Sequence, residues 1–376
     1  MPHIGLNLIF LVPDETGGME VYARHLIEEL VKQRPAGMDF TAFINRNAAA
    51  QRGPWNELVP SVTVPVNSRN RPAWVLADQS LVPAAAARKR VHMLHSLANL
   101  APAWGPYRRL LTVHDLIHRT FPDAHEGMKA KALSVVMPAG FRRSHRLIAI
   151  SEQTRDDLVN LFHEPAGKID VIPQGVGEPY PELAVPEAEL RARLAAGDRP
   201  IAFSLSAKRP HKNLPRLLDA LALIPAERRP PLVIPGYNTW HEDELREQAR
   251  ALGIEDDVRF LGWVSQAEVE GLYAASALFV FPSLYEGFGL PVLEAMQRGL
   301  PVACSDRTSL PEVAGDAALL FDPAKPEEIA AAMERLLAGG DEVERLRAAG
   351  YERARRFTWA ETARLTLETY ERTLGP

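Results

Sequence analysis

The sequence predicts an α/β protein with two doubly wound, parallel sheets. Short apolar runs alternate with longer amphipathic segments, and this alternation occurs twice along the 376 residues. Alternating strands and helices favour parallel sheets with helices on both faces. A stretch containing proline and glycine, GEPYPELAVP at residues 177–186, separates the two series and has the composition of a linker.

The first series begins with a strand predicted over residues 4–12 and an amphipathic helix over residues 20–33. Ser151 is a suitable N-cap for a helix over residues 152–162. Further strands of this series are predicted at residues 40–44, 110–113, 146–150 and 171–173.

The second series contains six predicted strands, at residues 200–205, 231–234, 258–261, 278–282, 301–304 and 317–321. The helices between them are predicted at residues 214–223, 241–252, 265–275 and 290–297. We therefore expect one domain over residues 1–180, a second over residues 181–356, and a C-terminal helix within residues 357–376 that packs on the first domain. Ligands of such folds bind at the carboxyl ends of the strands.

Composition and charge exclude several classes of protein. The hydrophobic fraction of 46% and the charged fraction of 24% are those of a globular protein. The net charge of -5 argues against a general nucleic-acid binder. The single cysteine, Cys304, excludes an intramolecular disulfide and fits a reducing cytoplasm. We find neither a signal-peptide pattern nor an apolar run of about 18 residues, so we predict a cytoplasmic protein.

Basic residues occur in short clusters within the first domain, at residues 88–90, 108–109 and 142–143. Such runs are most often solvated surface. The alternative is a peripheral contact with anionic phospholipid on the inner face of the membrane, or with a lipid-diphosphate acceptor.

The most informative segment is FPSLYEGFGLPVLE at residues 281–294. A predicted strand leads into a loop with two glycines, and a helix begins near Leu290. Exposed N–H groups at a helix start attract an anion. The carboxylates of Glu286 and Glu294 can accept hydrogen bonds from the hydroxyls of a sugar and of a ribose. By themselves, two glutamates at this spacing could equally be surface residues.

A second segment, KRPHKNL at residues 208–214, follows the first predicted strand of the second domain. Lys208, Arg209 and Lys212 could neutralise a diphosphate at this strand end. The alternative is a basic surface loop. The neighbouring predicted strands end shortly before Gly236 and Val264, which belong to the same predicted edge of the sheet.

Two features of the first domain also follow predicted strands. Gly17 and Gly18 precede a helix, where the backbone can approach a phosphate closely. His114 follows the strand predicted at residues 110–113. Many strand–helix turns contain two glycines, and a lone histidine is more often structural than functional.

Together these segments resemble family 4 of the retaining, nucleotide-sugar-dependent glycosyltransferases, which have the GT-B fold. The resemblance rests on Glu286 and Glu294 at the family's spacing, on EAMQRGLPV at residues 294–302, and on TSLPEVAGDAALLFDP at residues 308–323. It implies two Rossmann-like domains facing a central cleft, with the C-terminal helix returning to the first domain.

The resemblance also implies roles for individual residues. The residues expected to act in catalysis are His114, Glu286, Lys212 and Arg209. Those expected to bind the donor are Gly17, Gly18, Lys208, Gly236, Val264, Gly287, Phe288, Gly289, Leu290 and Glu294. No Asp-x-Asp motif is present, so neither a metal nor another cofactor is expected.

The expected reaction is transfer of a hexose from a nucleotide-diphosphate sugar to a saccharide or a lipid-linked saccharide in surface polysaccharide synthesis. GDP-mannose is favoured over a UDP-hexose because the VHDL and YEGFGLP segments resemble those of bacterial mannosyltransferases. The alternatives are a UDP-sugar-dependent transferase with a small-molecule acceptor, a sugar-nucleotide epimerase or phosphorylase of the same fold, and a non-catalytic nucleotide-binding protein. The first strand lacks a following G-x-G-x-x-G, which disfavours a dehydrogenase.

Overall fold

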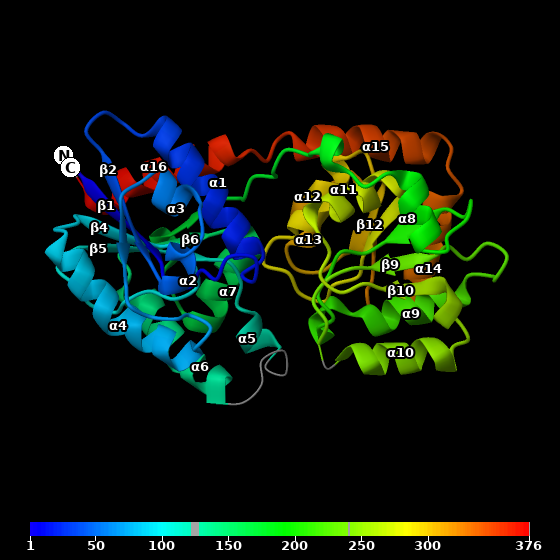
Figure 1. Cartoon of the computed structure of the whole chain (residues 1–376), viewed down its shortest axis with the longest axis horizontal. Coiled ribbons are helices and arrows are strands. Elements are labelled where there is room, and N and C mark those ends of the chain that lie inside the picture. The colour runs from blue at the N-terminus through cyan, green and yellow to red at the C-terminus, as the bar shows by residue number, and fades with distance from the viewer. Residues whose placement is uncertain (122–127, 240, 376) are drawn as a thin grey trace. The chain divides into compact units, whose positions relative to one another are not determined.

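The computed structural model describes residues 1–121, 128–239 and 241–375, with side chains outside residues 128–135. The chain divides into two compact units (Figure 1). Unit 1 comprises Met1–Gly175 and Phe357–Pro376, and unit 2 comprises Val176–Arg356. Unit 1 is therefore built from two separate stretches of sequence.

Within its described residues, unit 1 has a seven-stranded parallel sheet in the order β3-β2-β1-β4-β5-β6-β7. The strands are β1 (His3–Leu8), β2 (Asp39–Ile44), β3 (Ser61–Thr63), β4 (Met93–Ser96), β5 (Arg108–Val113), β6 (Arg146–Ala149) and β7 (Ile169–Val171). The helices are α1 (Gly18–Gln33), α2 (Arg46–Ala49), α3 (Pro54–Glu57), α4 (Arg71–Arg88), α5 (Ile117–Thr120), α6 (Met128–Arg143), α7 (Glu152–Phe162), the 3₁₀ turn η2 (Ala166–Lys168) and α16 (Trp359–Leu374).

Unit 2 has a six-stranded parallel sheet among the residues described, in the order β10-β9-β8-β11-β12-β13. The strands are β8 (Ile201–Phe203), β9 (Leu232–Ile234), β10 (Val258–Phe260), β11 (Ser276–Phe281), β12 (Val302–Ser305) and β13 (Ala318–Phe321). The helices are α8 (Glu187–Arg193), α9 (Leu214–Leu223), α10 (His241–Ala251), α11 (Gln266–Ala275), α12 (Leu290–Gln297), α13 (Leu310–Ala314), α14 (Pro326–Leu337) and α15 (Asp341–Ala354), with 3₁₀ turns η3 (Pro181–Leu183), η4 (Pro210–Lys212) and η5 (Glu255–Asp257).

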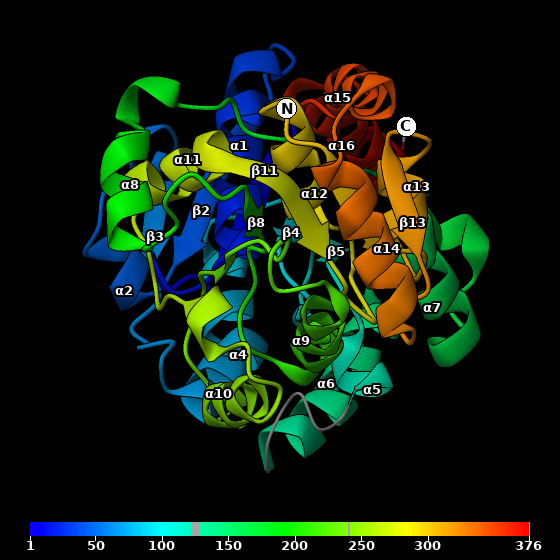
Figure 2. The same cartoon turned by 90° about the vertical axis from the view of Figure 1, so that its right-hand side faces the viewer.

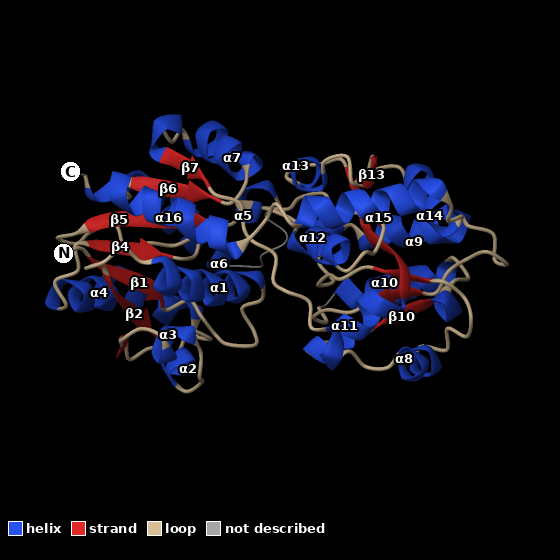
Figure 3. Ribbon diagram, turned by 90° about the horizontal axis from the view of Figure 1, so that it is seen from above, coloured by secondary structure: helices blue, strands red, loops and turns tan. Residues whose placement is uncertain are grey.

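Helices cover both faces of each sheet, which confirms the predicted α/β class (Figure 3). In unit 2, α9 packs against α10 and α14, while α12 packs against α15; Figure 2 views this unit from its end. In unit 1, adjacent residues of β5 face opposite cores: Leu110 joins the apolar cluster of α1 and α16, and Leu111 joins that of α6 and α7. Burial on both faces explains why these strands read as continuous apolar runs.

The predicted strands are all present, but several end earlier than expected. The strand predicted over residues 4–12 is β1, which ends at Leu8. The apolar residues that follow form a buried turn, in which the amide of Asn45 donates hydrogen bonds to the carbonyls of Ile9 (2.9 Å) and Leu11 (2.7 Å). A side chain thus satisfies backbone groups that a strand would have paired.

The helix α16 lies beside α1 and is part of the core of unit 1. Trp359, Ala363 and Tyr370 belong to the same apolar cluster as Leu26 of α1. At Gly175 the chain passes close to the start of α16, because a Cβ there would lie 2.2 Å from the nitrogen of Trp359. Only glycine permits this approach.

A buried chain of hydrogen bonds joins α16 to the sheet. The hydroxyl of Tyr370 lies 2.9 Å from Nδ1 of His95, and Nε2 of His95 lies 2.8 Å from Oγ1 of Thr112. The hydroxyl of Tyr22 lies 3.2 Å from the same Thr112 oxygen. Burial lowers the pKa of His95 to about 3, so its ring is neutral and donates from one nitrogen only.

We predict that Tyr370→Phe lowers the free energy of unfolding by about 1–3 kcal/mol, because it leaves Nδ1 of His95 buried without its partner. Urea denaturation measures this change. Glu371→Gln, an exposed change on the same helix, should stay within about 0.5 kcal/mol of the wild type. Equal stability of the two variants would contradict the role of the hydrogen bond.

Candidate functional site

The strand order of unit 2 reverses between β8 and β11. Counting from β8, the chain adds β9 and β10 on one side and β11 to β13 on the other. Ligands of doubly wound sheets bind outside the carboxyl ends of the strands at this reversal. The loop after β8 carries Lys208 and Arg209 and leads into η4, and the loop after β11 carries Glu286 and Gly289.

The two loops meet in an ion pair. Nζ of Lys212 donates to Oε1 of Glu286 at 2.6 Å and lies 5.2 Å from the ring centroid of Phe281. The two side chains are 17% and 13% exposed, so solvent screens this pair only partly. The N–H of Leu284 donates to the carbonyl of His211 at 2.8 Å, which ties the loops together beside the pair.

The loop after β11 is shaped by the residues that precede α13. Oγ1 of Thr308 accepts from the N–H of Glu286 at 3.1 Å, and Oγ of Ser309 lies 3.0 Å and 2.8 Å from the carbonyls of Glu286 and Phe288. Gly289 caps α12 with φ of 106°, and a Cβ there would lie 2.5 Å from Cδ2 of Leu310. A residue with a side chain would therefore clash at position 289. Gly287 and Phe288 come directly before this N-cap of α12.

Lys208 is fully buried, and its ammonium group bonds to groups of the protein itself. Nζ donates to the carbonyls of Gly236 (2.6 Å) and Leu261, and it lies 3.9 Å from Oε2 of Glu242. Burial lowers the pKa of Lys208 to about 8. Lys208 thus ties the loops after β8, β9 and β10 together. Arg209 is exposed and has no ion pair among the described residues.

The loops after β9 and β10 continue the carboxyl edge of the sheet beyond the loop after β8. The N–H of Gly236 donates to the carbonyl of Gly262 at 3.0 Å, and the ring of Trp263 stacks on Tyr237 with centroids 4.7 Å apart. Trp263 is 61% exposed. Val264 is half-buried and precedes Ser265, the N-cap of α11.

Glu294 lies on α12 and is half-buried. The hydroxyl of Tyr273 donates to its Oε2 at 3.0 Å. Burial raises the pKa of Glu294, while Arg298 and Tyr273 oppose this rise. The sequence assigned no role to Tyr273 or to Arg298, although Arg298 lies within residues 294–302, because their relation to Glu294 arises only from tertiary side-chain contacts.

The predicted residues of unit 1 lie at the carboxyl ends of β1 and β5. Nε2 of His114 donates to the carbonyl of Leu97 at 2.8 Å, and Nδ1 accepts from the amide of Gln174 at 3.1 Å. Burial lowers the pKa of His114 to about 4, so the ring is neutral. A Cβ at Gly17 or at Gly18 would meet no atom within 4 Å, so the start of α1 is open.

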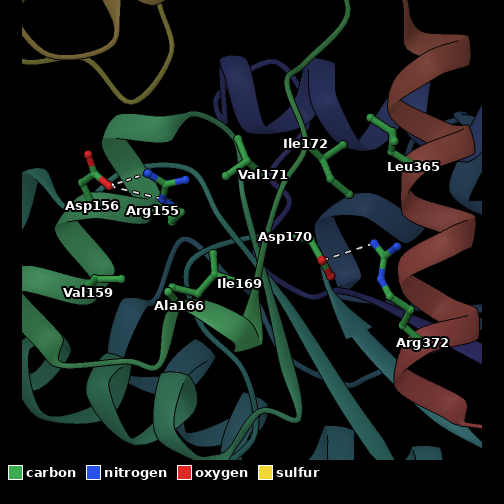
Figure 4. Close-up of a pocket in the computed structure, with 10 residues that line it drawn as sticks. All are labelled: Arg155, Asp156, Val159, Ala166, Ile169, Asp170, Val171, Ile172, Leu365 and Arg372. Atoms are coloured by element: carbon green, nitrogen blue, oxygen red, sulfur yellow. Dashed lines mark hydrogen bonds and ion pairs between the residues drawn. The ribbon is translucent and has the colours of Figure 1, made fainter.

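Two pockets of unit 1 lie away from these residues. A pocket of about 470 Å³ between α7, β7 and α16 contains Arg155 and Arg372, paired with Asp156 at 2.9 Å and Asp170 at 3.2 Å (Figure 4). Paired arginines of this kind are poorly suited to bind phosphate. A second pocket, of about 760 Å³, is lined by basic residues and is considered below.

Within the described residues, no group of three or more His, Cys, Asp or Glu side chains is placed to hold a metal ion. In the same part of the chain, no helix is both long enough and apolar enough to cross a membrane.

Two family models match successive halves of the chain. The model for Glycosyltransferase Family 4 matches residues 16–177, and the model for Glycosyl transferases group 1 matches residues 186–353. The O-antigen chain mannosyltransferase B of Escherichia coli is 33% identical over 275 residues, which is 70% of this chain and 70% of that protein. The chain belongs to glycosyltransferase family 4.

This glycosyltransferase is also 30% identical over 277 residues to the serotype-specific mannosyltransferase WbdA of Escherichia coli. The match covers 72% of this chain but only 34% of WbdA. Sucrose-phosphate synthase from Thermosynechococcus elongatus has the same fold, with a TM-score of 0.78, 22% identity and 98% of each chain covered. The predicted family and GT-B fold are confirmed, and the chain is a retaining hexosyltransferase.

We predict that Glu286→Gln makes this glycosyltransferase bind a nucleoside diphosphate without sugar about tenfold more tightly. We expect a diphosphate to bind Lys212. Glu286 occupies that lysine in the ion pair, so the substitution removes a competitor. Isothermal titration with GDP and UDP measures the affinities.

Glu327→Gln is the matched control, because it removes one negative charge from an exposed position of unit 2. It should leave the affinity unchanged, whereas Lys212→Met should weaken it. Weaker binding by Glu286→Gln than by the wild type would contradict the competition.

Proposed function

We propose that this glycosyltransferase moves mannose from GDP-mannose to a saccharide or lipid-linked saccharide acceptor in surface polysaccharide synthesis, with retention of configuration. The observation that carries the proposal is the pairing of Lys212 with Glu286 at the strand reversal of unit 2. The loop after β8 supplies the positive charge of Lys212 for a diphosphate. The loop after β11 supplies the carboxylate of Glu286, which can accept hydrogen bonds from sugar hydroxyls.

In this proposal Lys212 and Arg209 neutralise the diphosphate. Charge develops on the bridging oxygen as the bond between the sugar and the diphosphate breaks, and a cation held there stabilises the transition state more than the ground state. Arg209 is exposed at the N-cap of η4, three residues before Lys212. The N–H groups at the start of α12, with Gly287 to Leu290, supply further donors to the phosphate.

The carboxylate of Glu286 accepts hydrogen bonds from sugar hydroxyls once the diphosphate has taken Lys212. The acceptor hydroxyl then bonds to the anomeric carbon on the face that the diphosphate leaves, and its proton passes to a phosphate oxygen. Donor and acceptor oxygens thus share one face, so the configuration is retained. No carboxylate nucleophile is required on the opposite face.

His114 is proposed to contact a hydroxyl of the transferred sugar. Both of its ring nitrogens bond to protein groups, so this contact requires exchange of one partner. The amide of Gln174 is the partner that can be exchanged, because the bond to the carbonyl of Leu97 fixes the proton on Nε2. Gly17 and Gly18 offer open backbone for phosphate or acceptor.

The choice of mannose rests on the two Escherichia coli relatives, both of which are mannosyltransferases. A UDP-hexose is the alternative donor, and the experiment below separates the two.

We expect the purified protein to release GDP from GDP-mannose when a mannose-terminated saccharide is present, and to form the α-anomeric product seen by proton NMR. Lys212→Met should lower kcat/KM by about 10²-fold to 10³-fold, because a charge opposite the leaving group is lost. Release that is equally fast without acceptor would instead indicate hydrolysis or epimerisation. Turnover of UDP-glucose but not of GDP-mannose would assign the alternative donor.

We further propose that unit 1 contacts the anionic inner face of the membrane. The pocket of about 760 Å³ is lined by cationic and ring residues at the amino ends of β4 to β6, among them Arg90, His92, Arg108, Arg109 and His145. Arg90 and Arg108 are exposed and have no ion pair among the described residues. Cations near such a surface contribute about 1 kcal/mol each.

Helix α4, which precedes Arg90, carries exposed apolar residues. Leu76 and Leu81 are 69% and 44% exposed, and no charged residue lies between Pro72 and Ala87 except the buried Asp78. Trp104, 53% exposed, donates its indole N–H to the carbonyl of Gln79 at 2.7 Å. A helix surface with exposed leucines, no exposed charge and a neighbouring tryptophan has the composition of an interfacial surface.

The double variant Arg90→Gln/Arg108→Gln is expected to bind phosphatidylglycerol vesicles roughly tenfold more weakly than the wild type. Co-sedimentation measures the bound fraction. Arg345→Gln/Arg356→Gln removes two exposed cations from unit 2 and should have little effect. Equal losses in both double variants, or equal binding to phosphatidylcholine vesicles, would count against a specific face on unit 1.

A further inference from the structure

The side chains of Tyr273, Arg298 and Glu270 form a network that links α11 to Glu294 of α12. Arg298 donates two hydrogen bonds to the carboxylate of Glu270, from Nε at 2.7 Å and from Nη2 at 2.5 Å. The guanidinium carbon of Arg298 lies 4.8 Å from the ring centroid of Tyr273. The hydroxyl of Tyr273 then reaches Oε2 of Glu294 at 3.0 Å.

The position of Tyr273 is fixed from several sides. Its ring packs edge-on against Phe203 of β8, with centroids 5.0 Å apart, and lies 6.0 Å from Phe279 of β11. These are the two strands that flank the reversal of the sheet. With Arg298 on one face, the ring has little freedom to rotate away, and Tyr273 is only 2% exposed.

The direction of the hydrogen bond follows from the chemistry of its two groups. Burial raises the pKa of Tyr273 well above its ordinary value, so the phenol keeps its proton and donates it to Glu294. Oε2 is therefore directed towards the protein. Oε1 has no hydrogen bond to any of the residues that the structure describes, although the carboxylate is half-buried.

From this geometry we propose that Tyr273 is a positioning residue for ribose recognition: its hydroxyl, held in place by Arg298, turns Glu294 so that Oε1 faces the ribose of the donor. The proposal rests on the function proposed above and on the expectation from the sequence that Glu294 accepts hydrogen bonds from the ribose of the donor. It assigns selectivity for ribose over 2′-deoxyribose to a side chain that does not touch the nucleotide.

The same bond affects the charge of Glu294. The hydrogen bond from Tyr273 lowers the pKa of this carboxyl, which burial raises. Loss of the hydroxyl therefore raises that pKa further. Because an ionised carboxylate accepts from ribose hydroxyls better than a carboxylic acid does, Tyr273→Phe should lose nucleotide affinity at a higher pH than the wild type as the pH falls.

The test compares the affinities of the full-length protein for GDP and for 2′-deoxy-GDP, measured by isothermal titration. We expect the wild type to prefer GDP by roughly tenfold, since one hydrogen bond to a charged group separates the two nucleotides. Glu294→Gln should reduce this ratio to nearly one. Tyr273→Phe should reduce the ratio of the two affinities several-fold. It should also shift the pH at which GDP affinity is lost on acidification to a higher value.

Tyr370→Phe is the matched control, because it removes a buried phenol hydroxyl from unit 1. Its ratio of GDP to 2′-deoxy-GDP affinity, and the pH at which it loses GDP affinity, should equal those of the wild type. This separates ribose recognition from a general loss of stability. Circular dichroism spectra that match the wild type establish that Tyr273→Phe is folded.

The outcomes distinguish the two levels of the proposal. If Glu294→Gln abolishes the preference for GDP and Tyr273→Phe retains it, the positioning role is wrong and the ribose role of Glu294 stands. If both variants retain the preference, Glu294 is not the ribose ligand and the positioning role falls with it. Lys212→Met then still tests diphosphate binding, because its loss of affinity should be equal for GDP and 2′-deoxy-GDP.

Discussion

The parallel pairing of β8 with β11 is the constraint on which the candidate site depends. Phe203 lies opposite Phe279 in this pair, so the strands end at the same edge and their two loops start side by side. Lys212 and Glu286 are 74 residues apart in sequence and meet only because of this pairing. The rings of Phe203, Phe279 and Tyr273 pack beneath the loops, so the apolar core and the polar site share a boundary. A change in the register of this pair would separate the cation from the carboxylate.

The predicted elements have regular apolar patterns, whereas β4 and α4, which were not predicted, have weak local patterns. β4 reads MLHS, in which His95 and Ser96 interrupt the apolar run. Both are buried, and His95 is satisfied by Tyr370, which lies 275 residues later. α4 was also missed, because it contains Pro83, a run of alanines and no regular apolar stripe. In such segments the local pattern is weak, and long-range hydrogen bonds or packing determine the structure.

The same distinction applies to the site. Glu286 and Lys212 were predicted from the chemistry of their loops and from the family resemblance, and the structure brings them together. Which lysine of KRPHK stays available was not predictable, because the burial of Lys208 depends on the carbonyls of Gly236 and Leu261, which lie on other loops. Tyr273 carries no signal in the sequence either. Its role depends on where α11 places one hydroxyl relative to α12.

The two-part construction of unit 1 has a consequence for synthesis on the ribosome. Residues 1–175 leave the ribosome first, yet their core lacks Trp359, Ala363 and Tyr370 until α16 has followed. Unit 2 is continuous in sequence, so the domain that emerges second can complete its fold before the domain that emerged first. Until then His95 and the apolar residues that pack on α16 lack these partners. We therefore expect unit 2 to be able to fold before unit 1 is complete, against the usual N-terminal-first order.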